Sequence, residues 1–248
     1  MSPDVAAHAG SDPVHAVRGT LAVALRLFTE RDFDEGAAGH LTARDPLDPD
    51  VVHMNPIGVP FDELRASDLS RVAISTGDVD GEPVDRGGFR LHAAVYQARP
   101  DVNSVMHAHP VHVKAWSTLG RLLPPTTQES CIFYGKHAVH PEYLGVFGAT
   151  DEGARVAALF GDDNVAVILK HHAGVTVGAS VEAAAYRFYI LDRSCHAQLL
   201  AEAAANGSPL DLIDHRVAAA LAEEHHHSHT SFAPIYRSIV RRSPDVLD

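Results

Sequence analysis

The sequence is poor in the features that mark secreted, membrane-spanning and nucleic-acid-binding proteins. Its 248 residues include only two cysteines, Cys131 and Cys195, which excludes a disulfide framework and favours a reducing compartment. No apolar run is long enough to span a bilayer, and the N-terminus lacks the basic and apolar regions of a secretory signal. A formal net charge of −12 argues against nucleic acid or an anionic membrane as a partner. We therefore expect a cytoplasmic protein.

The composition is that of an ordinary globular protein with one substantial core. Apolar residues make up 46% of the chain and charged residues 21%. We expect a flexible N-terminus over residues 1–13 and a single domain over 14–208. A helical C-terminal tail over 209–248 is expected to pack on that domain or on a neighbouring subunit.

Helices and strands are predicted to interleave along the chain. Short, turn-rich links between the first strands indicate hairpins, and hence an antiparallel or mixed sheet. The predicted helices cover residues 14–31, 89–98, 111–119 and 181–205, and the first predicted strands cover 40–44, 51–54 and 72–75.

The main candidate for chemistry is His107-Ala108-His109. Apolar strand-forming residues lead into this motif, and Pro110 ends it. Side chains two residues apart on a strand point to the same face, so both imidazoles can reach one metal ion.

A second apolar strand, starting at Val165, also ends in histidine, at His171 and His172. The sequence therefore predicts a three-histidine metal site made of His107, His109 and one of His171 or His172. Imidazole suits zinc, iron or manganese, and three protein ligands leave a coordination position open. The alternative is chance, since a chain with 18 histidines contains many pairs.

Four ordered segments follow a recognisable pattern. They are G-x-x-G-H-L-T-A-R at 36–44, N-P-I-G-V-P at 55–60, L-H-x-x-x-Y-Q-A-R-P-D-V-x-x-x-x-H-A-H at 91–109, and L-K-H-H at 169–172 followed by T-V-G at 176–178 and V-E-A-A at 181–184. Together these segments resemble the class II aldolase/adducin family. The resemblance spans about residues 14–205 and is strongest to the adducin-like branch.

The resemblance implies an α/β fold, an αβα sandwich around a largely antiparallel mixed sheet. It also implies a homotetramer with active sites between subunits. The family's third metal ligand falls on His172, with one divalent ion per chain. We expect zinc, with manganese or iron as alternatives.

Two departures from the family pattern bear on function. The aldolases carry a glutamate, acting as general acid/base, at the position of Gly88 in this chain. Their phosphate-binding hydroxyl and amide side chains are replaced by His40, Ile57, Arg86 and Gly87. A sugar-phosphate aldolase is therefore not expected.

The remaining chemistry is that of a Lewis-acid site acting on an unphosphorylated hydroxy- or oxo-carboxylate. Decarboxylation is favoured because carbon dioxide leaves without a base, whereas retro-aldol cleavage needs one. The alternatives are retro-aldol cleavage or epimerisation, oxygen activation by an iron-loaded site, and a non-catalytic adducin-like binding module.

Supporting roles are predicted for four further residues, each with a plainer alternative. Arg86 could clamp a substrate carboxylate or be a surface arginine, and His40 could donate to the same anion or pack in its strand. Glu129 could face substrate or solvent. Tyr236 could reach a neighbouring subunit's site or pack within the tail. His92 is expected to be a structural histidine of its helix.

Overall fold

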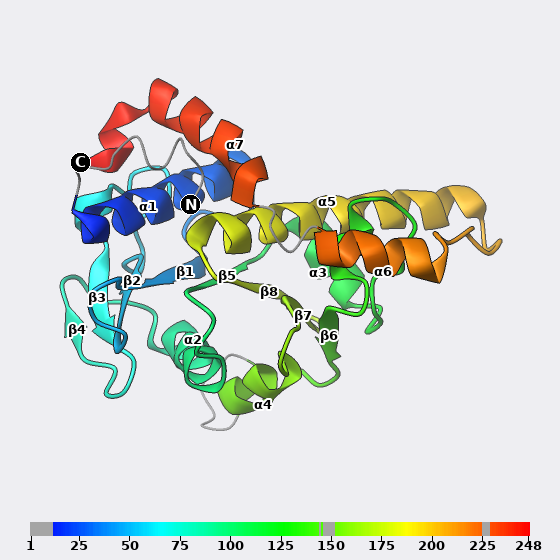
Figure 1. Ribbon diagram of the computed structural model, residues 1–248, viewed down its shortest axis with the longest axis horizontal. Helices are drawn as coiled ribbons and strands as arrows, with labels where there is room; N and C mark the ends of the chain where they lie inside the picture. The colour runs from blue at the N-terminus through cyan, green and yellow to red at the C-terminus, as the bar shows by residue number, and fades with distance from the viewer. Residues whose placement is uncertain (1–11, 144, 146–151, 225–228) are drawn as a thin grey trace.

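The computed structural model describes residues 12–143, 145, 152–224 and 229–248. They form three layers, with one eight-stranded sheet between two layers of helices (Figure 1). In chain order the elements are α1 (Pro13–Glu30), β1 (Gly39–Arg44), β2 (Val51–Met54), η2 (Ala66–Asp68), β3 (Ser70–Ala73), β4 (Val79–Asp80), α2 (Arg86–Ala98), β5 (Ser104–Ala108), α3 (Val111–Ser117), η3 (Ser130–Phe133), β6 (His137–His140), α4 (Glu152–Leu159), β7 (Ala166–Leu169), β8 (Ala173–Gly178), α5 (Val181–Ala205), α6 (His215–Glu224), α7 (His229–Arg242) and η5 (Pro244–Leu247).

The sheet runs in the order β4-β3-β2-β1-β5-β8-β7-β6. Every neighbouring pair is antiparallel except β6 and β7, which are parallel. This confirms the predicted αβα sandwich around a largely antiparallel mixed sheet. Strand β5 pairs with β1 on one side and β8 on the other, and all five of its residues are buried. The C-terminal end of β5 therefore lies in the middle of the molecule.

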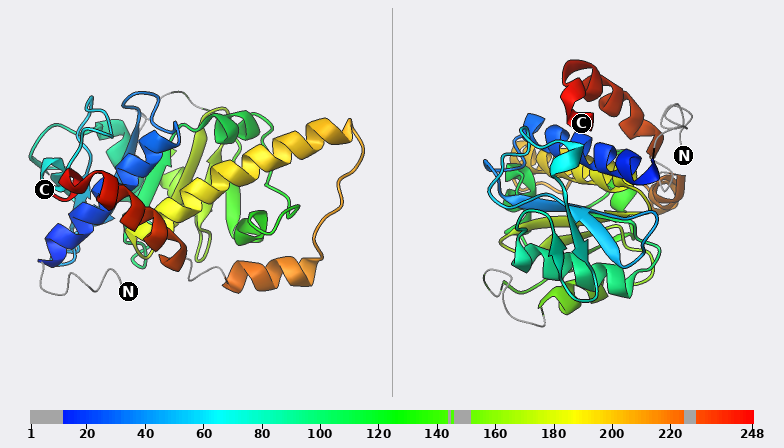
Figure 2. Two further views of the ribbon diagram at one scale, coloured as in Figure 1. Left: turned by 90° about the horizontal axis from the view of Figure 1, so that it is seen from above. Right: turned by 90° about the vertical axis from the view of Figure 1, so that its left-hand side faces the viewer.

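The two faces of the sheet carry different helices. Helices α1 and α5 cover one face, with α7 packed on their outer side, and α2 and α4 cover the other face (Figure 2). Because side chains alternate along a strand, Met106 and Ala108 of β5 join the apolar cluster under α1 and α5, whereas Val105 joins the cluster under α2 and α4. The same alternation on β1 sends Leu41 toward α1, and His40 and Thr42 toward α2.

Local capping sets the helix starts. Asp12 caps α1, Asp85 caps α2 and Ser180 caps α5, each by accepting a hydrogen bond from a backbone N–H of the first turn. Because Asp85 is the cap, α2 begins at Arg86, three residues before the predicted start. Strand β3 covers 70–73 rather than the predicted 72–75, where residues 74–76 form the following turn.

The C-terminal segment of the chain packs on its own body. Helix α6 lies against η3, and α7 lies against α1 and α5. Residues 1–11 of the predicted N-terminal segment lie outside the described residues. Within the described ranges, no helix combines the length and apolar character needed to cross a membrane.

Candidate metal centre

The candidate metal centre is built where β5 meets the β7–β8 turn. His107 lies on β5, and His109 follows it by two residues, just before the N-cap of α3. His172 does not end the second strand as predicted, because β7 stops at Leu169 and a turn follows. His172 instead directly precedes β8, whose pairing with β5 sets Gly174 opposite Ala108. That register brings His172 close to His107 on β5 and to His109 just beyond it.

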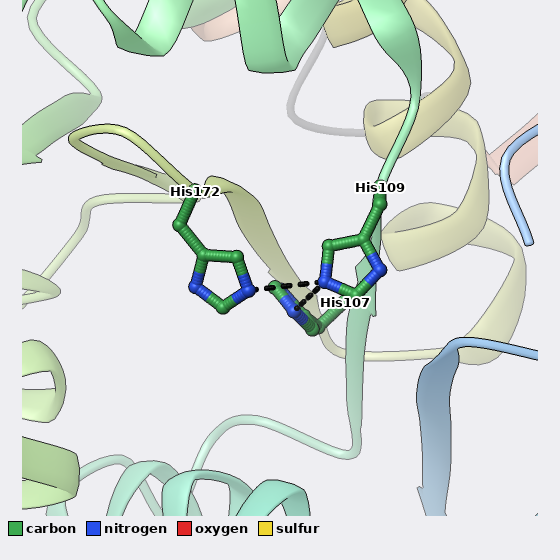
Figure 3. A group of neighbouring side chains, drawn as sticks. All are labelled: His107, His109 and His172. Atoms are coloured by element: carbon green, nitrogen blue, oxygen red, sulfur yellow. Dashed lines mark hydrogen bonds between the residues drawn. The ribbon is translucent and has the colours of Figure 1, made fainter. Parts of the chain in front are cut away.

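The three imidazoles converge through their Nε2 atoms (Figure 3). The Nε2 of His109 lies 3.1 Å from that of His107 and 3.0 Å from that of His172. Nitrogens that share one zinc ion at about 2.0–2.1 Å are separated by roughly 3–3.4 Å, so these spacings fit a common ion. His171 stands in the left-handed region with φ 60° and lies outside this group.

The hydrogen bonding of the rings also fits a metal. The Nδ1 of His107 donates to the carbonyl oxygen of Gly174 at 3.0 Å. The Nε2 of His107 therefore carries no hydrogen, and its lone pair is directed toward His109. Nitrogens with lone pairs directed at one another repel unless a proton or a cation lies between them. One cation among the three nitrogens removes this conflict for all of them.

The electrostatics keep these side chains neutral, as metal ligation requires. Burial lowers the pKa of His107 well below the ordinary value. Burial, followed by the neighbouring His109, lowers the pKa of His172 to about 4. The pKa of His109 is lowered by burial, against a smaller opposing effect of Glu35.

Glu35 was missed by sequence reasoning. Its Oε2 lies 3.9 Å from the Nδ1 of His109, a buried nitrogen with no hydrogen-bond partner in the described structure. Lys114 of α3 pairs with the same carboxylate and, through that hydrogen bond, lowers the pKa of Glu35. A carboxylate behind a ligating histidine orients the ring and raises its basicity. The signal available in the sequence was an acidic residue beside the glycine-rich 36–39 turn.

A hollow of about 270 Å³ opens beside the three histidines. Its wall comes from the turn before β1, from β1 itself, from the start of α2 and from Tyr143. The residues that line it include His40, Asn55, Asp85, Gly87 and Gly88.

The N-terminus of α2 faces this hollow but is already occupied. The Oδ1 of Asp85 accepts hydrogen bonds from the backbone N–H groups of Gly87 at 2.8 Å and Gly88 at 3.2 Å. A phosphate at this position would compete with a carboxylate for the same donors and meet its charge. The geometry therefore agrees with the loss of the phosphate-binding side chains.

Arg86 lies away from the hollow. Its Nη1 donates to the carbonyl oxygen of Gly77 at 2.9 Å, and it lines a separate hollow of about 400 Å³ between α2 and the turn after β3. Residues two apart on a helix are about 200° apart, so when Gly88 faces the histidines, Arg86 faces away. The predicted carboxylate clamp by Arg86 therefore gains no support from this structure.

Of the other predicted site residues, one lines the hollow and two lie away from it. His40 lines the hollow, 5% exposed. Glu129 is exposed at the start of η3 and does not line the hollow of its own chain. Tyr236 packs half-buried against the core under α1 and α5, where burial and then Glu182 raise its pKa. The predicted contact of Glu129 with substrate and the predicted reach of Tyr236 into a neighbouring subunit's site stay predictions.

The fold is a mixed-sheet αβα sandwich with three convergent histidines that could hold a metal ion, and comparison with known proteins places this chain in one family. The sequence profile of the class II aldolase and adducin N-terminal domain matches residues 19–199. The chain therefore belongs to the class II aldolase and adducin family.

Individual relatives extend over most of the chain. It is 40% identical over 228 residues (91% of this chain and 82% of the relative) to a Streptomyces roseochromogenus subsp. oscitans protein named 4-hydroxy-3-prenylphenylpyruvate oxygenase/4-hydroxy-3-prenylbenzoate synthase. It is 38% identical over 228 residues (91% and 84%) to Decarboxylase NovR of Streptomyces niveus. The solved structure of L-fuculose 1-phosphate aldolase from Glaciozyma antarctica PI12 superposes with a TM-score of 0.83 at 32% identity, covering 94% of this chain and 92% of that one.

Proposed function

We propose that this protein is a metal-dependent carbon–carbon lyase that decarboxylates an unphosphorylated hydroxy- or oxo-carboxylate. In this proposal His107, His109 and His172 hold one divalent ion per chain. The observation that carries it is the convergence of three neutral histidines on a hollow that has glycine at position 88 and a carboxylate already bound at the start of α2.

His107, His109 and His172 would hold the divalent ion, which would supply Lewis-acid stabilisation of the negative charge that develops as carbon dioxide leaves. The residues of the chain do the remaining work. The Gly174 carbonyl fixes the tautomer of His107, and Glu35 with Lys114 supports His109. Loss of carbon dioxide needs no base, so the glycine at position 88 is compatible with the reaction.

The relatives support this class of reaction. One is named a decarboxylase, and the other carries in its name an arylpyruvate, which is a 2-oxo acid. The superposed aldolase shares the fold, and retro-aldol cleavage or epimerisation is the alternative within the lyases. Against it stand the missing acid at position 88 and the occupied N-terminus of α2.

A second candidate is oxygen-dependent decarboxylation with iron at the same three histidines. The specific observation in its favour is the word oxygenase in the name of the 40% identical relative. Histidine-rich sites with open positions suit ferrous iron as well as zinc or manganese. Zinc remains our first expectation for the simple lyase, and iron is the expectation for the oxygen-dependent reaction.

The quaternary structure and location are part of the same proposal. We propose a homotetramer in which neighbouring subunits complete the sites, because the hollow is open and three predicted site residues lie elsewhere on the chain. A cytoplasmic location suits Cys131 and Cys195, which are both free and buried.

The test loads the metal-free protein separately with zinc, manganese and ferrous iron. Each form is incubated with hydroxyaryl dicarboxylates, 2-oxo acids and ketose phosphates, with and without oxygen, and carbon dioxide and aldehyde are assayed separately. Carbon dioxide in both atmospheres supports the simple lyase, and carbon dioxide only with iron and oxygen supports the second candidate. Efficient aldehyde release from a ketose phosphate would return the protein to the aldolases. A metal that proves dispensable, together with no effect of any small acid on thermal stability, would favour a non-catalytic binding module.

A further inference from the structure

The place that a side chain at position 88 would fill is taken by the ring of His40. A Cβ built on Gly88 would lie 2.2 Å from the Cδ2 of His40 and 2.3 Å from its Nε2. Neither atom can yield easily, because the ring is buried. In this chain, therefore, the position of the His40 ring on β1 requires a glycine at position 88 on α2.

A buried chain of hydrogen bonds holds the His40 ring from behind. Its Nδ1 lies 2.8 Å from the Nε2 of His92, and the Nδ1 of His92 lies 2.7 Å from the Oγ1 of Thr42. The Oγ1 of Thr42 lies 2.9 Å from the phenolic oxygen of Tyr96. All four side chains are at most 5% exposed. The ring of His40 also stacks on that of His107, with centroids 4.7 Å apart and planes at 29°.

The other nitrogen of the ring, Nε2, lies against Gly88, since a Cβ on that glycine would be 2.3 Å from it, and both residues line the hollow. Nδ1 is bound to His92, and the described residues provide no hydrogen bond to Nε2. His40 shares the lining of the hollow with His107, His109 and His172.

The chain of hydrogen bonds can run in either direction without a change in charge. If the hydroxyl of Thr42 donates to the carbonyl oxygen of Val105, 3.5 Å away, His92 can donate to Thr42 and His40 to His92. The Nε2 of His40 is then an acceptor. If Thr42 donates to His92 instead, the order reverses and Nε2 carries the hydrogen. Tyr96 can donate to Thr42 in both cases. The ring can therefore match a substrate carbonyl or a substrate hydroxyl.

We propose that His40, rather than a side chain at position 88, is the group that hydrogen-bonds the substrate oxygen beside the metal centre, and that His92, Thr42 and Tyr96 are the residues that position it. The inference rests on the proposed function only for the class of substrate, a hydroxy- or oxo-carboxylate. It changes the role of His92 from a purely structural histidine to a positioning one.

The first test measures the contact on metal-free protein. Overpacking a buried site destabilises the folded protein, so Gly88→Ala should lower the melting temperature by roughly 3–10 °C. In a His40→Ala background the same substitution should have almost no effect, because the obstructing ring is gone. Equal losses in both backgrounds would overturn the claim that His40 fills this place.

The second test separates the two nitrogens of His40. An asparagine amide mimics Nδ1 and a glutamine amide mimics Nε2, so His40→Asn keeps the bond to His92 and His40→Gln keeps the group facing the hollow. With zinc-loaded protein and 4-hydroxyphenylpyruvate as the probe, we expect a roughly tenfold weaker Kd for His40→Asn, and a smaller loss for His40→Gln. Melting temperatures should rank the other way. The reverse order for binding would overturn the proposal.

The third test concerns the positioning residues. We expect His92→Leu to weaken probe binding roughly fivefold or more, and His92→Gln to restore most of it, because glutamine can again bond to His40. His137→Asn is the matched control: it removes a buried histidine bonded to Leu123 and Phe133, far along the chain from the cluster. This control should lower stability but leave the Kd unchanged. Equal Kd values in His92→Leu and wild type would refute the positioning role.

A failure of the proposed function can be distinguished from a failure of the inference about His40. Wild-type protein that binds the probe but releases no carbon dioxide from any acid would count against the proposed function, while the His40 and His92 series would still decide this inference. Carbon dioxide release that is unaffected by His40→Asn would support the function and overturn the inference.

Discussion

Two groups of histidines lie side by side in this protein and are bonded in opposite ways. In the first group, His107, His109 and His172 direct their Nε2 atoms at one another, and the Nε2 of His109 lies 3.1 Å from that of His107 and 3.0 Å from that of His172. In the second group, His40 and His92 are linked to each other and to the hydroxyl of Thr42. The first arrangement leaves lone pairs that a cation would satisfy, and the second leaves one nitrogen for a substrate.

The comparison teaches that burial alone does not distinguish a metal ligand from a hydrogen-bonded histidine. Burial is the main cause that lowers the pKa of His107 and His172 in one group and of His40 and His92 in the other. What differs is the partner of each ring nitrogen. Carbonyl and carboxylate groups support the first group from behind, whereas hydroxyls complete the second.

The largest effect should come from removing a proposed ligand. We expect His107→Ala to weaken zinc binding at least about a hundredfold and to abolish carbon dioxide release, because two imidazoles remain. His171→Ala, which changes the neighbour of His172 without touching the cluster, should bind zinc normally. Elemental analysis and competition with a chromophoric chelator measure both. Full metal occupancy in His107→Ala would contradict the assignment of the first group of histidines as the metal ligands.

The next effect is a dependence of stability on pH. Burial lowers the pKa of His172 and of His137 to about 4, from an ordinary value of 6.5. The unfolded chain therefore binds more protons than the folded one between these values. The contribution of each neutral, buried histidine to the free energy of unfolding should be fully present above about pH 6.5. It should be lost as the pH drops toward 4, by up to about 3 kcal/mol for His137.

Urea unfolding of metal-free protein between pH 7.5 and 5 measures this effect. The metal should leave over the same range, because protonated imidazole cannot bind it. His172→Gln should lose the metal dependence but keep the part of the pH dependence that comes from His137. A metal-free protein of constant stability over this range would contradict the neutral, buried state of both histidines.

A smaller effect on zinc affinity is expected from changing Glu35, whose carboxylate lies beside the Nδ1 of His109. Glu35→Gln removes the charge 3.9 Å from the Nδ1 of His109, so zinc affinity should fall, by up to about tenfold because the carboxylate is nearly half-exposed. Glu30→Gln is the matched control, since Glu30 pairs with Arg242 at the surface away from the cluster. Chelator competition compares the two variants. An equal affinity in both would show that Glu35 serves only Lys114.

The smallest effect is expected at Arg86. Because its guanidinium faces Gly77 and a separate hollow, Arg86→Gln should change KM for a carboxylate substrate less than about twofold. Steady-state kinetics measure this change. A tenfold rise in KM would restore the carboxylate clamp predicted from the sequence and would place it in an assembled site.

The sequence by itself determined the family, the layered fold and the two chain segments that supply the histidine cluster, one with His107 and His109 and one with His171 and His172. Helix α5 was predicted over 181–205 and is observed there, because Ser180 and a continuous helical run are local signals. His107 and His109 were predicted on one face because strand alternation is local as well.

Only the tertiary structure decided which side chains meet across the layers. His172 stands in a turn rather than on a strand, and its arrival at His109 depends on the register of β8 against β5. Arg86 turns away because the glycine face of α2 packs toward the hollow. His40 and Gly88 are 48 residues apart, and their contact depends on how β1 lies under α2. Periodicity and capping act within a few residues, whereas these contacts follow from packing between elements, which the order of residues along one element does not specify.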